Sequence, residues 1–376
     1  MARALAGPWF GSLETSVNDL IARPDIQSRL AHLPVARWFA RRDGANIFQI
    51  IQGFVSSQVV TALVQLNVFE RLALGGMTAD ALGAELGVDP DRLAVFLQAG
   101  AALQLLRRRS GGVYCLSRKG AALRGVPGLT DMILHHAAFL RDLEDPVGLI
   151  QGRTDTALSQ FWPYVLNPDV VGQGEAARYS HLMAQSQALV AEDTLRQVRL
   201  ESVRHLMDVG GGSGAFLGAV AARYDRIGLT LFDLPQTRAA AQANLAQAGL
   251  TQRVAQVDGS FKADALPSGA DTISLVRVLY DHGEDTVRNL LAKVYAALPP
   301  GGRILISEPM SGGRRPDPIT DVYFALYTMA MGTGRTRSAE TIASLLTAAG
   351  FEAIKAPRPI RSYVTRVVLA RKPLSA

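Results

Sequence analysis

Residues 206–217 read Leu-Met-Asp-Val-Gly-Gly-Gly-Ser-Gly-Ala-Phe-Leu, and this stretch decides the fold. An apolar run reaches Asp208, glycines follow at Gly210, Gly212 and Gly214, and a helical pattern then begins. Glycine is required where the backbone turns sharply or approaches a ligand, and the free N–H groups of the next helix face that ligand. The stretch predicts a strand, a cofactor-binding loop and a helix. A dinucleotide fingerprint and a glycine turn without a ligand are the alternatives.

Downstream of the loop, short apolar runs alternate with helical patterns. Strands are expected, with helices between the first five, at 206–210, 228–233, 253–257, 271–277, 302–308, 352–357 and 363–371. Such alternation is typical of a mostly parallel sheet with helices on both faces, and the last two strands are expected to be antiparallel. The predicted fold class is α/β, a Rossmann-like seven-stranded domain after a mostly α module. The predicted parts are an irregular arm at 1–46, a winged-helix module at 47–125, helices at 126–192 and the α/β domain at 193–376.

The winged-helix prediction rests on the order of its signals. They are an amphipathic helix at 47–66, a short helix between Thr78 and Gly87, a helix at 89–106, and a strand after a Gly-Gly turn. The helix at 89–106 starts with Asp-Pro-Asp-Arg and is otherwise mostly apolar, whereas base readout needs basic or amide side chains near the helix start. No nucleic acid partner is expected, and a DNA-binding regulator is a remote alternative.

The composition fits a well-packed intracellular protein. Of its 376 residues, 48% are hydrophobic and 19% are charged, which argues against a disordered chain. Cys115 is the only cysteine, so the chain cannot form an internal disulfide and the cytoplasm is the expected compartment. No cluster of Cys, His and carboxylate residues has metal-ligand spacing, so no metal is expected.

Acidic residues follow the second and third strands. Asp233 ends the second strand, where a carboxylate can bind both ribose hydroxyls of a nucleotide. Asp258 follows the third strand and can accept a hydrogen bond from an adenine amine, while Phe261 can pack on the ring. Each of these residues also fits an ordinary surface turn, so the argument depends on the whole set.

Taken together, the glycine loop, the two acidic positions and the Pro-Pro-Gly-Gly turn at 299–302 resemble class I S-adenosylmethionine-dependent methyltransferases. With a winged-helix module the chain resembles the small-molecule O-methyltransferases, whose module dimerises. The resemblance implies a homodimer, S-adenosylmethionine as cofactor, S-adenosylhomocysteine as product, and no metal. It implies cofactor contacts from Asp208, Gly210, Gly212, Gly214, Asp233, Leu234, Asp258, Ser260, Phe261 and Arg277.

Three segments, at 179–188, 277–282 and 324–335, are similar to the carotenoid 1-hydroxy O-methyltransferases of purple photosynthetic bacteria. This implies methyl transfer to the tertiary 1-hydroxyl of an acyclic carotenoid of the demethylspheroidene or hydroxyneurosporene type. Alternatives are another lipophilic acceptor, such as a bacteriochlorophyll precursor or a polyketide, and a homologue that binds the cofactor without catalysis. A nicotinamide-dependent oxidoreductase is disfavoured by the residues around the loop.

The motif after the fourth strand departs from the family. Phenol-methylating relatives have His-Asp-Trp there, with His as the base, whereas this chain has Tyr280, Asp281 and His282. A tertiary alcohol is far less acidic than a phenol, so proton loss is expected to accompany or follow methyl transfer. Candidate proton acceptors are His282, Asp281 and Tyr280, in that order of chemical suitability. A purely structural role for each is the alternative.

Aromatic, His and Met residues of two regions are expected to line a long apolar acceptor pocket. Tyr323, Tyr327 and Met331 recur every fourth residue and would share one helix face, and only one of two adjacent histidines can face a pocket. The predicted pocket residues are His135, His136, Phe139, Phe161, Tyr164, Tyr179, Met183, Tyr323, Tyr327 and Met331. A place in the ordinary core is the alternative for each.

The arm combines aromatic and basic residues. Trp38 and Phe39 lie among Arg37, Arg41 and Arg42, a mixture that suits the interface of an anionic membrane. Because a carotenoid acceptor resides in membrane, peripheral contact with the photosynthetic membrane is expected for an otherwise cytoplasmic enzyme. A solvated basic surface is the alternative.

Overall fold

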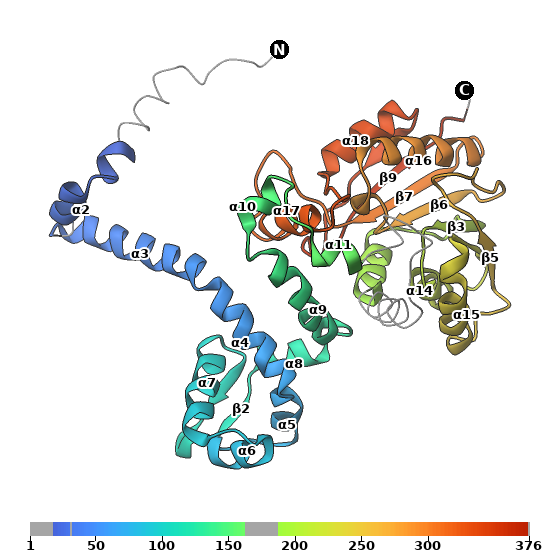
Figure 1. The fold of residues 1–376 in the computed structure, drawn as a ribbon. Helices are drawn as coiled ribbons and strands as arrows, with labels where there is room; N and C mark the ends of the chain where they lie inside the picture. Colours follow the sequence, from blue (N-terminus) through green and yellow to red (C-terminus); the bar gives the residue numbers. More distant parts are fainter. Residues whose placement is uncertain (1–17, 31, 162–186, 375–376) are drawn as a thin grey trace. The chain divides into compact units, whose positions relative to one another are not determined.

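The computed structural model describes residues 18–30, 32–161 and 187–374. The chain divides into two compact units, Met1–Gly120 and Ala121–Ala376 (Figure 1). The predicted division into four parts is finer than this one and stays a prediction.

The second unit contains a seven-stranded sheet with the order β5-β4-β3-β6-β7-β9-β8. Strands β3 to β7 run parallel, and β9 is antiparallel to both β7 and β8, which confirms the predicted α/β class and the antiparallel last pair. The strands are β3 (His205–Val209), β4 (Gly228–Asp233), β5 (Val254–Asp258), β6 (Thr272–Val276), β7 (Arg303–Glu308), β8 (Glu352–Lys355) and β9 (Arg366–Arg371).

Helices cover both faces of this sheet (Figure 1). Successive side chains of a strand point to opposite faces, so each buried strand contributes to two cores. On β7, Ile304 and Ile306 pack with α16 (Glu284–Ala297) and α18 (Ala339–Ala348), whereas Leu305 packs in the core that contains α14 and α15. The helices on this second face are α14 (Ala215–Arg223), α15 (Arg238–Gln247) and the helical residues 187–197.

The expected helix between the third and fourth strands is absent. Residues 259–271, which join β5 to β6, form turns and bends. Gly259, Pro267 and Gly269 interrupt this short segment, and glycine and proline are the weakest helix formers. The other three connections among the first five strands contain helices, as predicted.

A further group of helices in the second unit packs on itself through aromatic residues. Phe139, Leu158 and Tyr327 are members of one buried cluster that these helices share. The helices are α9 (Leu129–Asp142), α10 (Pro146–Ile150), α11 (Ala157–Phe161) and α17 (Thr320–Ala330).

The first unit has the predicted order of helix, turn, helix and hairpin. Thr78 caps α6 by accepting the Ala81 N–H, and Asp89 caps α7 by accepting the Arg92 N–H, which confirms both helix starts. The elements are α2 (Pro24–Leu30), α3 (Pro34–Ile51), α4 (Gly53–Gln65), α5 (Val68–Leu74), α6 (Ala79–Leu86), α7 (Pro90–Ala102), β1 (Leu106–Arg108), β2 (Tyr114–Leu116) and, across the unit boundary, α8 (Arg118–Gly125).

Two expectations for this unit were wrong. The helix predicted to reach residue 106 ends at Ala102, because Leu106–Arg108 pairs with Tyr114–Leu116 as an antiparallel hairpin. The arm is not irregular, since α2 and α3 occupy part of it. Pro34 stands at the start of α3, where its fixed φ suits a helix, and the Arg42 guanidinium lies 5.4 Å from the centre of the Trp38 ring four residues earlier.

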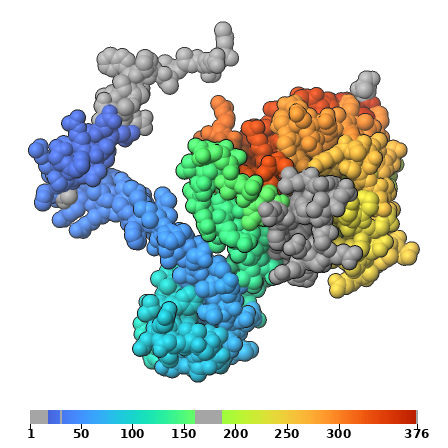
Figure 2. All heavy atoms as spheres, in the orientation of Figure 1, coloured from blue at the N-terminus to red at the C-terminus, as the bar shows by residue number. Residues whose placement is uncertain are grey.

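Helix α3 continues into α4 after a bend of 48°. The predicted single helix at 47–66 is therefore the end of one helix and the start of another. None of the α3 residues is buried, and this blue segment exposes its side chains on the face seen in Figure 2. Within the described residues, no single helix is long and apolar enough to cross a membrane, although α3 and α4 meet that test of length and composition as a bent pair.

Candidate functional site

The glycine loop lies at the carboxyl end of β3, between β4 and β6. Three of its glycines have positive φ angles, 71° at Gly210, 55° at Gly212 and 71° at Gly214, which L side chains rarely adopt. Adjacent parallel strands that lead to opposite sides of a sheet create a crevice at this point, where open α/β sheets bind ligands. The loop therefore has the backbone geometry that the sequence predicts.

Asp208 lies beneath the loop and is fully buried. Its Oδ1 accepts a hydrogen bond from the Ser274 hydroxyl at 2.6 Å. A Cβ at Gly211 would lie 2.3 Å from the other oxygen, Oδ2, so the carboxyl group packs directly against the backbone of the loop. Burial raises the pKa of Asp208 to about 7, and the negative charge of Asp233 adds to the rise.

Asp233 joins the glycine loop to β4. Its Oδ2 accepts the Gly212 N–H at 2.6 Å and its Oδ1 accepts the Leu234 N–H at 2.7 Å. Burial raises the pKa of Asp233, while these two N–H groups oppose the rise. The structure thus brings Asp233, Leu234 and the glycines together, as the predicted ribose site requires.

The residues predicted to bind adenine, Asp258, Ser260 and Phe261, are held by a separate set of contacts. Both oxygens of Asp258 accept from Arg238 Nε, at 2.8 and 2.9 Å, an ion pair that the sequence analysis missed. The following loop is held by Lys293, whose ammonium donates to the carbonyl oxygens of Phe261, Lys262 and Asp264. The Ser260 N–H also donates to the Asp264 carboxylate, at 2.7 Å.

Two of the predicted catalytic residues, Tyr280 and Asp281, lie on a 3₁₀ turn, η3 (Leu279–Asp281), that follows β6, and His282 comes directly after it. Tyr280 is buried in the aromatic cluster with Phe139 and Tyr327. The His282 ring instead meets the Phe261 ring edge to face, with centroids 5.2 Å apart. The structure therefore separates the two side chains, which face different surroundings.

Glu308 fixes this turn to β7. The side chain is 1% exposed, and its Oε1 accepts the N–H groups of Val278 at 2.9 Å and Leu279 at 2.8 Å. Its Oε2 accepts the Tyr280 N–H at 3.3 Å. Burial raises the pKa of Glu308 to about 7, although the three N–H groups oppose the rise. No role was predicted for Glu308 from the sequence, although a carboxyl group at the end of an apolar central strand is a signal of such a role.

Asp281 is a half-buried residue whose carboxyl group also interacts with the Tyr280 side chain. Its Oδ1 is buried and has no hydrogen-bond partner among the described residues. Burial raises the pKa of Asp281 well above its ordinary value, a rise that Arg277 opposes and Glu308 increases. Arg277 has a φ of 57°, and its Nη2 donates to the Tyr280 hydroxyl at 3.1 Å. Burial also raises the pKa of Tyr280, so this phenol stays protonated near neutral pH.

Helices α9 and α17 bring several predicted pocket residues together. His136 Nε2 is 2.8 Å from the Tyr323 hydroxyl, and the Tyr323 and Tyr327 rings stack with centroids 5.2 Å apart. Met331, just after α17, is 1% exposed and belongs to the same cluster, so the predicted shared helix face is confirmed. Burial lowers the pKa of neighbouring His135 to about 4, with His136 adding to the effect.

Some predicted pocket residues cannot be placed against this cluster. Helix α11 ends at Phe161, whose side chain lies outside the described residues. Tyr164, Tyr179 and Met183 also lie outside them. Their contribution to the acceptor pocket stays a prediction.

Comparison with known proteins identifies two domains. Residues 166–352 match an O-methyltransferase domain, and residues 48–123 match an O-methyltransferase dimerisation domain. The chain is 51% identical to the demethylspheroidene O-methyltransferase of Cereibacter sphaeroides over 92% of this chain and 91% of the relative. It is 48% identical to the enzyme of the same name from Rhodobacter capsulatus, over 90% and 85% of the two chains. Human N-acetylserotonin methyltransferase, solved in complex with S-adenosylmethionine, shares the fold with a TM-score of 0.74 and 23% identity, over 88% of this chain and 98% of that one.

Gly211→Ala tests the loop as the binding site of S-adenosylmethionine. The new methyl group would lie 2.3 Å from Asp208 Oδ2 and 2.7 Å from Leu231 Cδ1, so the loop or these two buried side chains must shift. We expect calorimetry to show at least a roughly tenfold weaker affinity, about 1.4 kcal/mol. Gly218→Ala is the control, since its nearest neighbour would lie at 3.9 Å. Equal affinity in the two variants would exclude the loop as the site.

The pH dependence of folding tests the burial of His282. Burial lowers the pKa of His282 from 6.5 to about 4, so between these values the unfolded chain binds a proton that the folded chain does not. This difference destabilises the wild type as the pH falls. Relative to the wild type, we expect His282→Phe to gain about 2 kcal/mol in free energy of unfolding on going from pH 7.5 to pH 5. Urea denaturation at both pH values measures this, and a constant difference between the two proteins would contradict it.

Proposed function

This chain belongs to the family of O-methyltransferases with an amino-terminal dimerisation domain, and on that premise we propose that it methylates the tertiary hydroxyl of an acyclic hydroxycarotenoid. The observation that carries the proposal is the 51% identity, over 92% of the chain, to a demethylspheroidene O-methyltransferase. As a member of this family the chain is an S-adenosylmethionine-dependent enzyme, and the dimerisation domain indicates a homodimer.

The residues around β3 fit the cofactor. The loop backbone is open at Gly212, where a Cβ would meet no atom within 4 Å. We assign ribose binding to Asp233, whose two oxygens already accept N–H groups from this loop and its neighbour. Phe261 supplies an aromatic ring at the adenine side. S-adenosylmethionine, when bound, supplies a methyl group on a positively charged sulfur.

The contribution of the protein to the reaction is orientation and removal of one proton. A phenol has a pKa of about 10, and a tertiary alcohol is so much less acidic that its prior ionisation would cost more than ~10 kcal/mol. A basic side chain of the protein would therefore accept the proton of the acceptor hydroxyl during or after methyl transfer, and not before it. Alignment of the acceptor against the aromatic cluster of α9 and α17 would then supply most of the rate.

We propose that Asp281, rather than His282, accepts the proton of the substrate hydroxyl. The pKa of the Asp281 carboxyl is raised by burial, which makes its carboxylate a stronger base, and Oδ1 has no partner among the described residues. Burial weakens His282 as a base and its ring packs on Phe261. Tyr280 is a neutral phenol that receives a hydrogen bond from Arg277. The order of the three candidates thus changes from that given by chemical type alone.

An acceptor panel tests the proposed substrate. We expect labelled S-adenosylmethionine to transfer its methyl group to a 1-hydroxycarotenoid in detergent, and not to a catechol, a bacteriochlorophyllide or a polyketide phenol. Transfer to a phenol alone would contradict the carotenoid assignment. With the accepted substrate, Asp281→Asn should lower kcat at least ~100-fold and His282→Phe far less, since a positioned base contributes about 10²–10⁴-fold. A larger loss of kcat in His282→Phe than in Asp281→Asn would instead identify His282 as the proton acceptor.

We also propose that the enzyme collects its substrate at the surface of an anionic membrane. Trp38 and Phe39 on α3 are 56% and 52% exposed. Arg37, Arg41 and Arg42 accompany them on the same helix, and aromatic and basic side chains together suit a headgroup interface.

Flotation with vesicles tests this membrane contact. We expect the wild type to float with vesicles that contain 30% phosphatidylglycerol, in ~0.1 M salt, and less so at ~1 M salt, where screening is stronger. A variant with Trp38→Ala and Phe39→Ala should remain in the dense fractions. Val95→Ala is the control, since Val95 is 75% exposed on α7. Equal flotation of the double variant and the wild type would contradict the proposal.

A further inference from the structure

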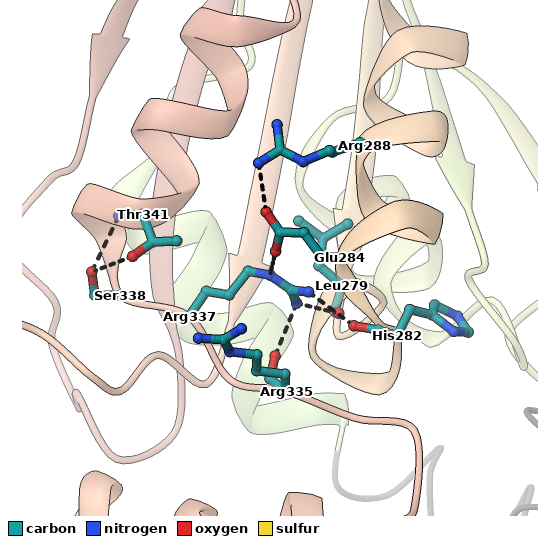
Figure 3. Close-up of polar contacts among 8 residues, drawn as sticks. All are labelled: Leu279, His282, Glu284, Arg288, Arg335, Arg337, Ser338 and Thr341. Carbon is teal, nitrogen blue, oxygen red and sulfur yellow. Dashed lines mark hydrogen bonds and ion pairs between the residues drawn. The ribbon is translucent and has the colours of Figure 1, made fainter.

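Arg337 is a buried arginine that binds main-chain carbonyl groups of residues 278–282, the turn that carries Tyr280 and Asp281. Only 4% of the residue is exposed. Its Nη1 donates to the carbonyl oxygens of Leu279 at 3.0 Å and Arg335 at 2.9 Å, and its Nη2 donates to that of His282 at 3.0 Å. Its Nε lies 3.4 Å from Glu284 Oε2 (Figure 3). The guanidinium thus spans both ends of the turn.

The rest of the same segment binds the carbonyl groups between these two. The Arg335 N–H donates to the Tyr280 carbonyl oxygen at 2.8 Å, and the Thr333 hydroxyl donates to the Asp281 carbonyl oxygen at 3.1 Å. A side chain at Gly334 would meet the Tyr280 carbonyl oxygen at 2.7 Å, so close contact is built into the segment. Four consecutive carbonyl groups of the turn are therefore bound by residues 333–337.

The N–H groups of the turn point to a different partner. Glu308 accepts three of them, from residues 278–280, while Arg337 takes carbonyl groups at 279 and 282. An anion and a cation thus bind opposite polar groups of one short turn. Burying either charge is costly unless it is fully hydrogen-bonded, so both groups depend on the turn keeping this orientation.

We propose that Arg337 is a positioning residue, which orients the turn carrying Tyr280 and Asp281 for methyl transfer; this inference rests on the proposed function. Arg337 reaches the turn through its main chain, so its effect on the reacting groups is indirect. The glycine loop follows β3, and Asp233 ends β4. Among the described residues, the hydrogen bonds of Arg337 reach neither of them. Its loss should therefore affect the catalytic step more than cofactor binding.

Arg337→Gln tests this role by two independent measurements. We expect kcat to fall at least about tenfold while the dissociation constant of S-adenosylhomocysteine changes less than about threefold, because a small misplacement slows the chemical step. Hydrogen exchange of the peptide spanning 275–285 should become faster than in the wild type. Arg337→Lys should recover part of kcat, since an ammonium group can still donate to carbonyl oxygens but lacks the planar fork.

Arg288→Gln is the matched control. Arg288 is exposed and donates to the other oxygen of Glu284 at 2.9 Å (Figure 3), so this variant removes an Arg–Glu contact and leaves the turn alone. Unchanged exchange at 275–285 in Arg337→Gln, or an unchanged kcat, would overturn the proposal. If Arg337→Gln does not fold, the same measurements on Arg337→Lys decide. Absence of methyl transfer by the wild type would count against the carotenoid assignment, while hydrogen exchange would still report on Arg337.

Discussion

The buried carboxyl group of Glu308 is the interaction on which the site depends. It stands at the end of β7 and holds the connection after β6 by three backbone N–H groups. A carboxylate removed from water is costly unless its oxygens are hydrogen-bonded, and here the backbone supplies those bonds. A side chain at the end of β7 therefore determines the path of the backbone after the neighbouring strand, β6. The side chains that the turn carries inherit their directions from this contact.

The side chains of His282 and Tyr280 point to different parts of the site. His282 faces Phe261, on the side where the cofactor loop is close, since a Cβ at Gly210 would lie 3.7 Å from that ring. Tyr280 faces the aromatic cluster of α9 and α17, where an apolar acceptor would be held. In the proposed function, the turn therefore lies between the cofactor and the acceptor. Because Glu308 fixes the backbone of the turn, the side chains that the turn carries can change without altering this division.

Much of this arrangement follows from local sequence patterns, and the rest depends on distant contacts. The sequence pattern located all seven strands. The five parallel strands are short, mostly apolar runs, and the two antiparallel strands at the end of the chain are separated by a short link that contains proline. Most of helix α3 was missed, since only its end falls within the predicted helix at 47–66 and charged residues at 37 and 41–43 interrupt the apolar residues before it. The pairing of Asp258 with Arg238 and the contacts of Arg337 join residues 20 and 55–58 positions apart. No period or motif specifies such pairs, so they could not be predicted from the sequence.

Strand β9 has a consequence for how the protein is made. It lies between β7 and β8, so Arg366–Arg371 forms an interior strand of the sheet although it is the last of the seven in the chain. Val367 and Val368 complete the two cores on opposite faces. Until these residues have left the ribosome, the edge of β7 has unpaired backbone groups that can pair with another chain. The α/β domain can therefore close only after synthesis of this strand, and ribosomes that stop before it release chains prone to aggregation.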